Sequence, residues 1–121
     1  MNLFDASALL AFVQDEEGAD LVERELGHGG VCSAANWSEV AQKVLAHGRD
    51  WELVRALLTS YDLRVEPVSA ADAEEAALLW RAGTGLSLAD RLCLALGDRL
   101  GATVWTADST WGTGDLIRQI R

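Results

Sequence analysis

Four acidic residues stand where the sequence could position a catalytic or metal-binding carboxylate. Asp5 ends a short apolar run at the start of the chain, and Asp108 follows the apolar segment from Ala102 to Thr106. Glu39 and Asp90 are each expected in the first turn of a helix that begins near the end of a strand. Their oxygens would suit Mg²⁺ or Mn²⁺ better than zinc. The pattern indicates a divalent-metal site built from carboxylates.

Each of these acids also has an ordinary structural explanation. Asp90 follows Ser87 at capping-box spacing, and Glu39 could cap Asn36 or lie on an exposed helix face. Asp108 could form a turn. Asp5 is harder to explain in this way, because a charge after a central strand is costly unless it is paired or bound to a metal. At this point both explanations stay open.

Convergence of the four acids would create strong repulsion. Two like charges near 4 Å repel by up to about 4 kcal/mol at an effective dielectric constant of 20. A divalent cation would relieve that repulsion, whereas a metal-free domain would not tolerate it comfortably. If the four acids lie close together, we therefore expect the protein to bind a metal ion there.

The elements that would position these acids alternate between strands and helices. The sequence predicts strands at Asn2–Asp5, Val31–Cys32, Leu63–Val68, Ala102–Thr106 and Leu116–Ile120, with Pro67 placing the third at an edge. It predicts helices at Ser7–Val13, Gly18–Leu26, Ala34–His47, Asp50–Ser60, Ser69–Ala82 and Ser87–Leu100. The predicted fold is α/β, with a mostly parallel central sheet of about four to five strands and helices on both faces.

Leucine spacing predicts which helix faces are buried. Leu53, Leu57 and Leu58 are expected to face inward from the fourth helix, and Leu88 is expected to begin an apolar stripe on the last one. In open parallel sheets, sites form in the crevice outside the carboxyl ends of the strands. Asp5 and Asp108 are both expected there.

Composition limits the class of protein. The chain has 121 residues, half of them hydrophobic, and only one proline, which favours a single folded domain spanning residues 1–121. Met1–Asp5 lacks the basic start of a signal peptide, and no apolar run is long enough to span a membrane, so we expect a cytoplasmic protein without a membrane partner. Cys32 and Cys93 are expected to be small buried hydrophobes.

The net charge of −9 is opposite to that of most nucleic-acid binders, unless metal offsets some of the carboxylates. We expect the arginines to gather at the rim of the crevice, with Arg91 beside Asp90 as the first candidate.

Four segments together resemble the PIN-domain ribonucleases, in particular the VapC toxins of bacterial toxin–antitoxin pairs. They are residues 3–9 (LFDASAL), 33–40 (SAANWSEV), 86–95 (LSLADRLCLA) and 104–108 (VWTAD). Each is weak alone, but their order, their spacing and the chain length make the combination specific. One departure is visible, because Ser109 stands where many relatives have an arginine.

The resemblance implies that Asp5, Glu39, Asp90 and Asp108 form an acidic metal site, with Ser7 and Thr106 as neighbours. We expect Asp5 and Asp90 to be the principal ligands of Mg²⁺ or Mn²⁺, with Glu39 and Asp108 completing the shell directly or through water. The implied activity is a metal-dependent endoribonuclease that hydrolyses RNA phosphodiester bonds. A structured RNA such as a tRNA would be its substrate.

The resemblance also implies partners, namely a cognate VapB-type antitoxin and a second copy in a homodimer. Apolar residues on Trp37–Leu45 and Trp51–Leu58 are candidates for an antitoxin groove, and Ser69–Trp80 for a dimer contact. Two alternatives remain. A haloacid-dehalogenase-like phosphatase also begins with a strand ending in Asp, but it needs a second Asp where Ser7 stands. A non-catalytic partner-binding domain of the same fold would use the acids only as helix caps.

Overall fold

A computed structural model describes residues 1–121 and contains a five-stranded parallel sheet at the centre of the fold. The strand order is β3-β2-β1-β4-β5. The strands are β1 (Asn2–Phe4), β2 (Gly30–Ser33), β3 (Leu63–Glu66), β4 (Thr103–Thr106) and β5 (Ile117–Gln119). Every neighbouring pair is parallel, which confirms the predicted sheet. β3 lies at an edge and ends before Pro67, since proline cannot continue the ladder of hydrogen bonds.

Six α-helices connect the strands. They are α1 (Ala6–Val13), α2 (Ala19–Leu26), α3 (Ala34–Ala46), α4 (Trp51–Thr59), α5 (Ala70–Leu78) and α6 (Leu88–Leu100), and a short 3₁₀ helix, η1, spans Ser109–Trp111. The predicted extension of α5 to Ala82 is wrong, because the helix ends at Leu78 and an exposed turn follows.

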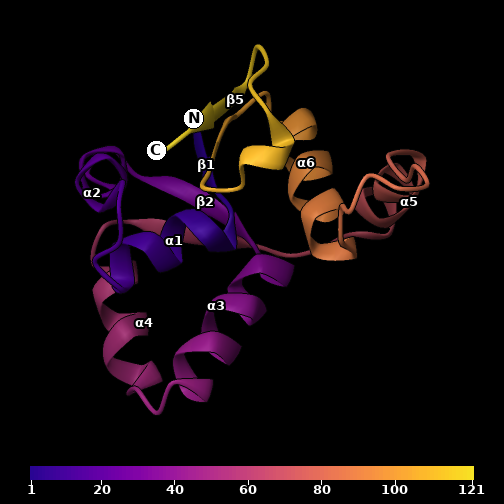
Figure 1. Ribbon diagram of the computed structural model, residues 1–121. Helices are drawn as coiled ribbons and strands as arrows, with labels where there is room; N and C mark the ends of the chain where they lie inside the picture. Colours follow the sequence, from indigo (N-terminus) through magenta and orange to yellow (C-terminus); the bar gives the residue numbers. More distant parts are fainter.

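Helices cover both faces of the sheet (Figure 1). On one face, Phe4 and Cys32 pack with apolar residues of α1, α2, α3 and α4. On the other face, Leu3 and Val104 pack against Cys93 and other residues of α6. The α6 backbone lies so close to the sheet that a Cβ at Gly97 would stand 2.7 Å from Val104 Cγ2. This fit fixes α6, and therefore Asp90 at its beginning, against the central strands.

Three leucines that were predicted to face inward are exposed, namely Leu53, Leu57 and Leu88. Leu53 and Leu57 are 70% and 42% exposed, and Leu58 is the one leucine of the predicted set that is buried. Val54 lies four residues before Leu58, and these two residues form the inward stripe of α4. Leu88 is also exposed, because it precedes the buried part of α6. None of the six helices combines the length and the apolar character that a membrane span requires.

An ion pair joins α5 to α6. Asp72 caps the start of α5 in a capping box with Ser69 and is almost fully buried. Arg99 donates from Nε to Asp72 Oδ1 at 2.8 Å and from Nη2 to Oδ2 at 3.1 Å. These hydrogen bonds hold the pKa of Asp72 below its usual range. The pair fixes α5 against the helix that holds Asp90.

Removing the arginine should therefore destabilise the fold. Arg99→Met leaves the Asp72 carboxylate buried without its bidentate partner, and we expect a loss of about 1–3 kcal/mol in the free energy of unfolding. Urea denaturation of the two proteins measures it. Arg55→Met is the matched control, because Arg55 pairs with Glu52 at 3.8 Å on the surface and such pairs contribute little. Equal losses in both variants would contradict the structural role of Arg99.

Candidate functional site

The carboxyl ends of the central strands lie next to the beginnings of α1, α3 and α6 (Figure 1). Asp5 follows β1 directly and is the N-cap residue of α1, where its Oδ1 accepts from the Ala8 backbone N–H at 2.8 Å. Its side chain is buried, with the whole residue only 4% exposed. A central strand followed at once by a helix thus places one carboxylate at the carboxyl edge of the sheet.

Two hydroxyl groups hold the Asp5 carboxylate in place. Ser7 Oγ lies 2.7 Å from Oδ1, and Thr106 Oγ1 donates to Oδ2 at 2.6 Å. Each hydroxyl also accepts from the backbone that follows β4: Ala107 N–H donates to Ser7 at 2.8 Å, and Asp108 N–H donates to Thr106 at 3.0 Å. Ser7 and Thr106 therefore contact Asp5 and connect it to the turn that holds Asp108.

Burial raises the pKa of Asp5 to about 6, because a charged carboxylate is poorly solvated inside the protein. Hydrogen bonds from Thr106, Ala8 and Ser7 act in the opposite direction, and the nearby negative charge of Asp90 adds to the rise. Near neutral pH, the charged form of the Asp5 carboxyl is therefore disfavoured by its surroundings. A cation bound beside it would stabilise that charged form.

This shift predicts how Asp5→Asn changes stability with pH. A carboxyl whose pKa is 3.8 unfolded and about 6 folded stabilises the fold at low pH, and that contribution disappears as pH rises through 6. Asparagine does not titrate. Relative to wild type, the free energy of unfolding of Asp5→Asn should therefore rise by about 2 kcal/mol between pH 4.5 and 7.5.

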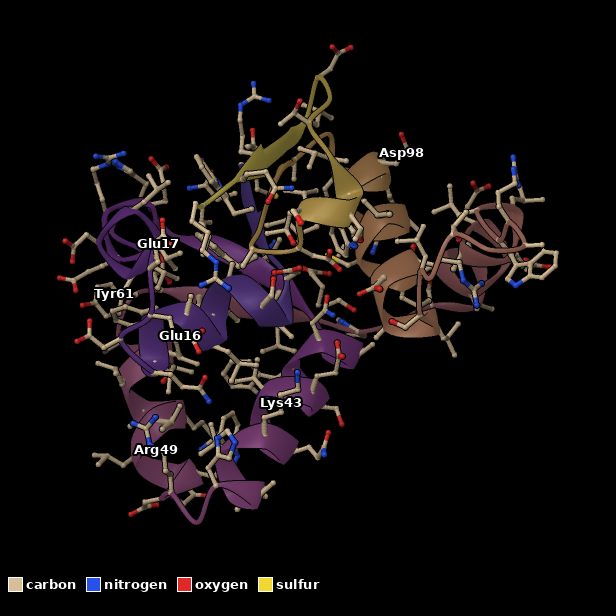
Figure 2. The ribbon with its side chains drawn as sticks, in the orientation of Figure 1. Glu16, Glu17, Lys43, Arg49, Tyr61 and Asp98 are labelled. Carbon is tan, nitrogen blue, oxygen red and sulfur yellow. The ribbon has the colours of Figure 1, made fainter.

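Denaturation in chelator at several pH values measures this difference. Asp98→Asn is the control for removing one negative charge, because Asp98 is exposed at the other end of α6 (Figure 2). A stability difference for Asp5→Asn that stays constant from pH 4.5 to 7.5 would show that its carboxyl is not buried as described.

Asp90 lies in the first turn of α6, as the sequence predicts. It forms a capping box with Ser87: its Oδ2 accepts from the Ser87 N–H at 3.0 Å, and its own N–H donates to Ser87 Oγ at 3.1 Å. Its Oδ1 atom accepts no hydrogen bond, and its charge contributes to the raised pKa of Asp5. Asp90 thus has a structural role, and its negative charge also acts on Asp5.

Glu39 lies in the second turn of α3, and its predicted place in the first turn is wrong because the helix begins at Ala34. Its Oε1 accepts from Asn36 Nδ2 at 2.7 Å. Burial raises the pKa of both cysteine thiols, and the charges of Asp5 and Glu39 add to that effect at each of them. The charge of Asp90 also acts on Cys93. Three carboxylates from three elements therefore act on the same part of the interior.

Asp108 is turned toward its own loop. Its Oδ1 accepts from the Thr110 N–H at 2.9 Å and from the Thr110 hydroxyl at 2.6 Å, so the side chain caps η1. Only its backbone N–H contacts the Asp5 network, through Thr106. Thr110 thus binds one oxygen of this carboxylate, Oδ1, and the other oxygen accepts no hydrogen bond.

The donor chemistry fits a hard divalent cation, but the four acids are not gathered. No group of three or more His, Cys, Asp or Glu side chains is close enough to hold a metal ion. The carboxylate oxygens are nevertheless of the type that Mg²⁺ and Mn²⁺ prefer. The negative charges of Asp5 and Asp90 repel each other, and a bound cation would reduce that repulsion. The fit therefore rests on this pair.

Arg91 does not lie free at the rim of the crevice. Its Nη1 donates to the Ala76 carbonyl oxygen of α5 at 3.0 Å, and its Nε is buried without a partner. The side chain therefore connects α6 to α5. The sequence did not predict this contact. It did pair Glu39 with Asn36, but as a helix cap, whereas the structure shows a hydrogen bond between the two side chains within α3. A spacing of three residues on one helix face was the signal for the second contact.

One family model matches most of the chain, and solved structures share its fold. The family model of the PIN domain matches residues 3–112. A structure of a toxin–antitoxin complex from Klebsiella pneumoniae matches with a TM-score of 0.81 and 18% identity, over 100% of this chain and 98% of that chain. The sarcin–ricin-loop-cleaving toxin VapC20 of Mycobacterium tuberculosis matches with a TM-score of 0.70 and 17% identity, over 96% and 92%. No curated protein matches.

Proposed function

The chain belongs to the PIN domain family, and we propose that it is a metal-dependent endoribonuclease that acts as the toxin of a toxin–antitoxin pair. The observation that supports this best is the buried Asp5 carboxylate, whose pKa burial raises to about 6, with the negative charge of Asp90 adding to the rise. The similar structures include a toxin–antitoxin complex and a toxin described as cleaving the sarcin–ricin loop, which agrees with this function.

In this proposal, Asp5 and Asp90 hold Mg²⁺ or Mn²⁺, and Glu39 and Asp108 complete the shell directly or through water. The metal would polarise the phosphate and lower the pKa of the attacking water. Ser7 and Thr106 keep both Asp5 oxygens oriented, so that the carboxylate does not rotate when substrate binds. In hydrolysis, the water oxygen forms a bond to phosphorus while the bond to the leaving ribose oxygen breaks.

The proposed substrate is a structured RNA such as a tRNA, cleaved in the cytoplasm by a single domain spanning residues 1–121. A net charge of −9 disfavours long, non-specific contacts with phosphates. Four of those charges belong to the proposed ligands and would be offset by metal. A compact RNA loop needs fewer backbone contacts than an extended strand, so it suits this surface better.

The proposed partners are a VapB-type antitoxin and a second copy of the chain. Leu45 of α3 and Leu53 and Leu57 of α4 are exposed, so these two neighbouring helices offer apolar contacts for an antitoxin helix. Leu78 and Trp80, at and just beyond the end of α5, are 68% and 61% exposed. They are the proposed homodimer contact.

A non-catalytic binding domain is the second candidate, because the carboxylates of Asp90 and Asp108 cap helices in this structure. The phosphatase alternative has less support, since Ser7 is bound to Asp5 where a second Asp is needed.

One experiment separates these functions. Purified protein is incubated with folded RNA in millimolar Mn²⁺, in excess EDTA, and in EDTA followed by Mn²⁺, with p-nitrophenyl phosphate as a parallel substrate. The proposal predicts internal RNA cleavage that chelation abolishes and Mn²⁺ restores, and no phosphatase activity. Mn²⁺ binding measured by calorimetry gives the independent check. RNA cleavage in EDTA, or no heat of Mn²⁺ binding, would contradict the proposal.

A further inference from the structure

Three buried polar side-chain atoms have no hydrogen-bond partner, and each belongs to a residue close in sequence to a site acid. They are Asn36 Oδ1, near Glu39; Arg91 Nε, next to Asp90; and Trp111 Nε1, near Asp108. Unpaired buried polar groups lower stability and are rare in folded proteins. Departures of this kind are expected where function, and not stability, determines the residue.

Asn36 is the clearest of the three. Arg91 donates to the Ala76 carbonyl, and Trp111 packs against the apolar cluster under α6. Asn36 is 1% exposed, and its only side-chain hydrogen bond goes from Nδ2 to Glu39 Oε1 at 2.7 Å. A carboxylate only accepts hydrogen bonds, so the amide nitrogen must face Glu39 and the amide oxygen is left unpaired.

A purely structural role does not explain Asn36. The start of α3 is already capped by Ser33, whose Oγ accepts from the Ala35 N–H at 3.2 Å. The Asn36 side chain bonds to no backbone group. Glu39, for its part, has no arginine, lysine or histidine within ion-pair distance, so Asn36 is its only polar side-chain partner.

We propose that Asn36 is a positioning residue that holds the Glu39 carboxylate for catalysis at the expense of folding stability. The proposal rests on the ribonuclease function proposed above. Replacement by leucine, which has a similar volume and no polar atoms, removes the unpaired oxygen and frees Glu39 to rotate. Stability and activity should then change in opposite directions.

The test compares four proteins: wild type, Asn36→Leu, Asn36→Thr and the exposed-face control Ser38→Ala. We expect Asn36→Leu to melt at or above the wild-type temperature while its kcat for RNA cleavage falls about tenfold and KM stays unchanged. Threonine offers a hydroxyl donor near Glu39, so Asn36→Thr should recover much of the kcat. Ser38→Ala should resemble wild type in both measurements.

A double-mutant cycle shows whether Asn36 acts through Glu39. In a Glu39→Gln background, Asn36→Leu should lower kcat no further, because there is no carboxylate left to position. Mn²⁺ calorimetry adds a readout that does not depend on activity: Asn36→Leu should weaken Mn²⁺ binding about tenfold.

The outcomes separate the two proposals. If wild type does not cleave RNA, the ribonuclease function is wrong, and unchanged Mn²⁺ affinity in Asn36→Leu would also overturn the positioning role. If wild type cleaves RNA and Asn36→Leu cleaves it equally well, the positioning role alone is overturned. A markedly lower melting temperature for Asn36→Leu would show that Asn36 is structural.

Discussion

Asp5→Asn and Asp90→Asn are each expected to lower the rate of RNA cleavage by at least about 100-fold, while Asp98→Asn retains wild-type activity. Loss of a principal metal ligand removes several kcal/mol of transition-state stabilisation, and each 1.36 kcal/mol is a factor of ten in rate. Asp98 lies on the same helix as Asp90 but at its other end, where it is exposed (Figure 2). Initial rates on one folded RNA in saturating Mn²⁺ measure the effect.

The two asparagine variants keep the capping geometry and remove the charge. At position 90, an amide oxygen can still accept from the Ser87 N–H, and Ser87 Oγ still accepts from the backbone of residue 90. At position 5, asparagine remains one of the best N-cap residues for α1. A loss of activity in a folded variant is therefore a loss of the carboxylate and not of the helix.

Retained activity in these variants would contradict the role of Asp5 and Asp90 as metal ligands. Full activity in either variant would show that the acid only caps its helix, and full activity in both would remove the basis of the proposed metal site. Melting curves in EDTA accompany the rates. They show whether an inactive variant is folded.

The backbone of the candidate site could be predicted from the sequence because it depends on short-range patterns. The apolar residues before Asp5 mark a buried strand, and the pair Ser87 and Asp90 marks the first turn of a helix. Both features are present in the structure. The fold class followed from the alternation of such segments, since parallel strands need connecting helices.

Side-chain directions and long-range partners could not be predicted in this way. Asp108 was placed at the end of a strand, but Thr110, two residues later, determines where its carboxylate points. Leu53 and Leu57 have helical spacing that fits an inward stripe. The rotation of α4 about its axis nevertheless turns Val54 and Leu58 toward the core and leaves Leu53 and Leu57 exposed. The contact between Asp72 and Arg99 spans 27 residues and has no local signal.

A cationic side chain from an antitoxin should compete with the metal for the same carboxylates. Asp5 is buried, with its pKa raised to about 6, so either a metal ion or an inserted Arg or Lys would relieve its charge. If both occupy one site, the apparent Kd of the antitoxin rises by the factor 1 + [Mn²⁺]/Kd for Mn²⁺. At 100 times that Kd, we expect antitoxin binding to weaken about 100-fold.

Titration of the cognate antitoxin, or of a peptide from its tail, against the protein in EDTA and in Mn²⁺ measures this competition. Two matched variants show which side chains take part in the competition. An antitoxin tail with its inserted Arg replaced by Met should bind with an affinity that Mn²⁺ does not change, because the apolar contacts proposed for it, at Leu45, Leu53 and Leu57, include none of the four site acids. Asp98→Asn in the toxin should leave the competition as it is in wild type. If wild-type antitoxin binds equally well with and without Mn²⁺, no cation enters the acidic crevice, and inhibition must come from blocking the path of the RNA.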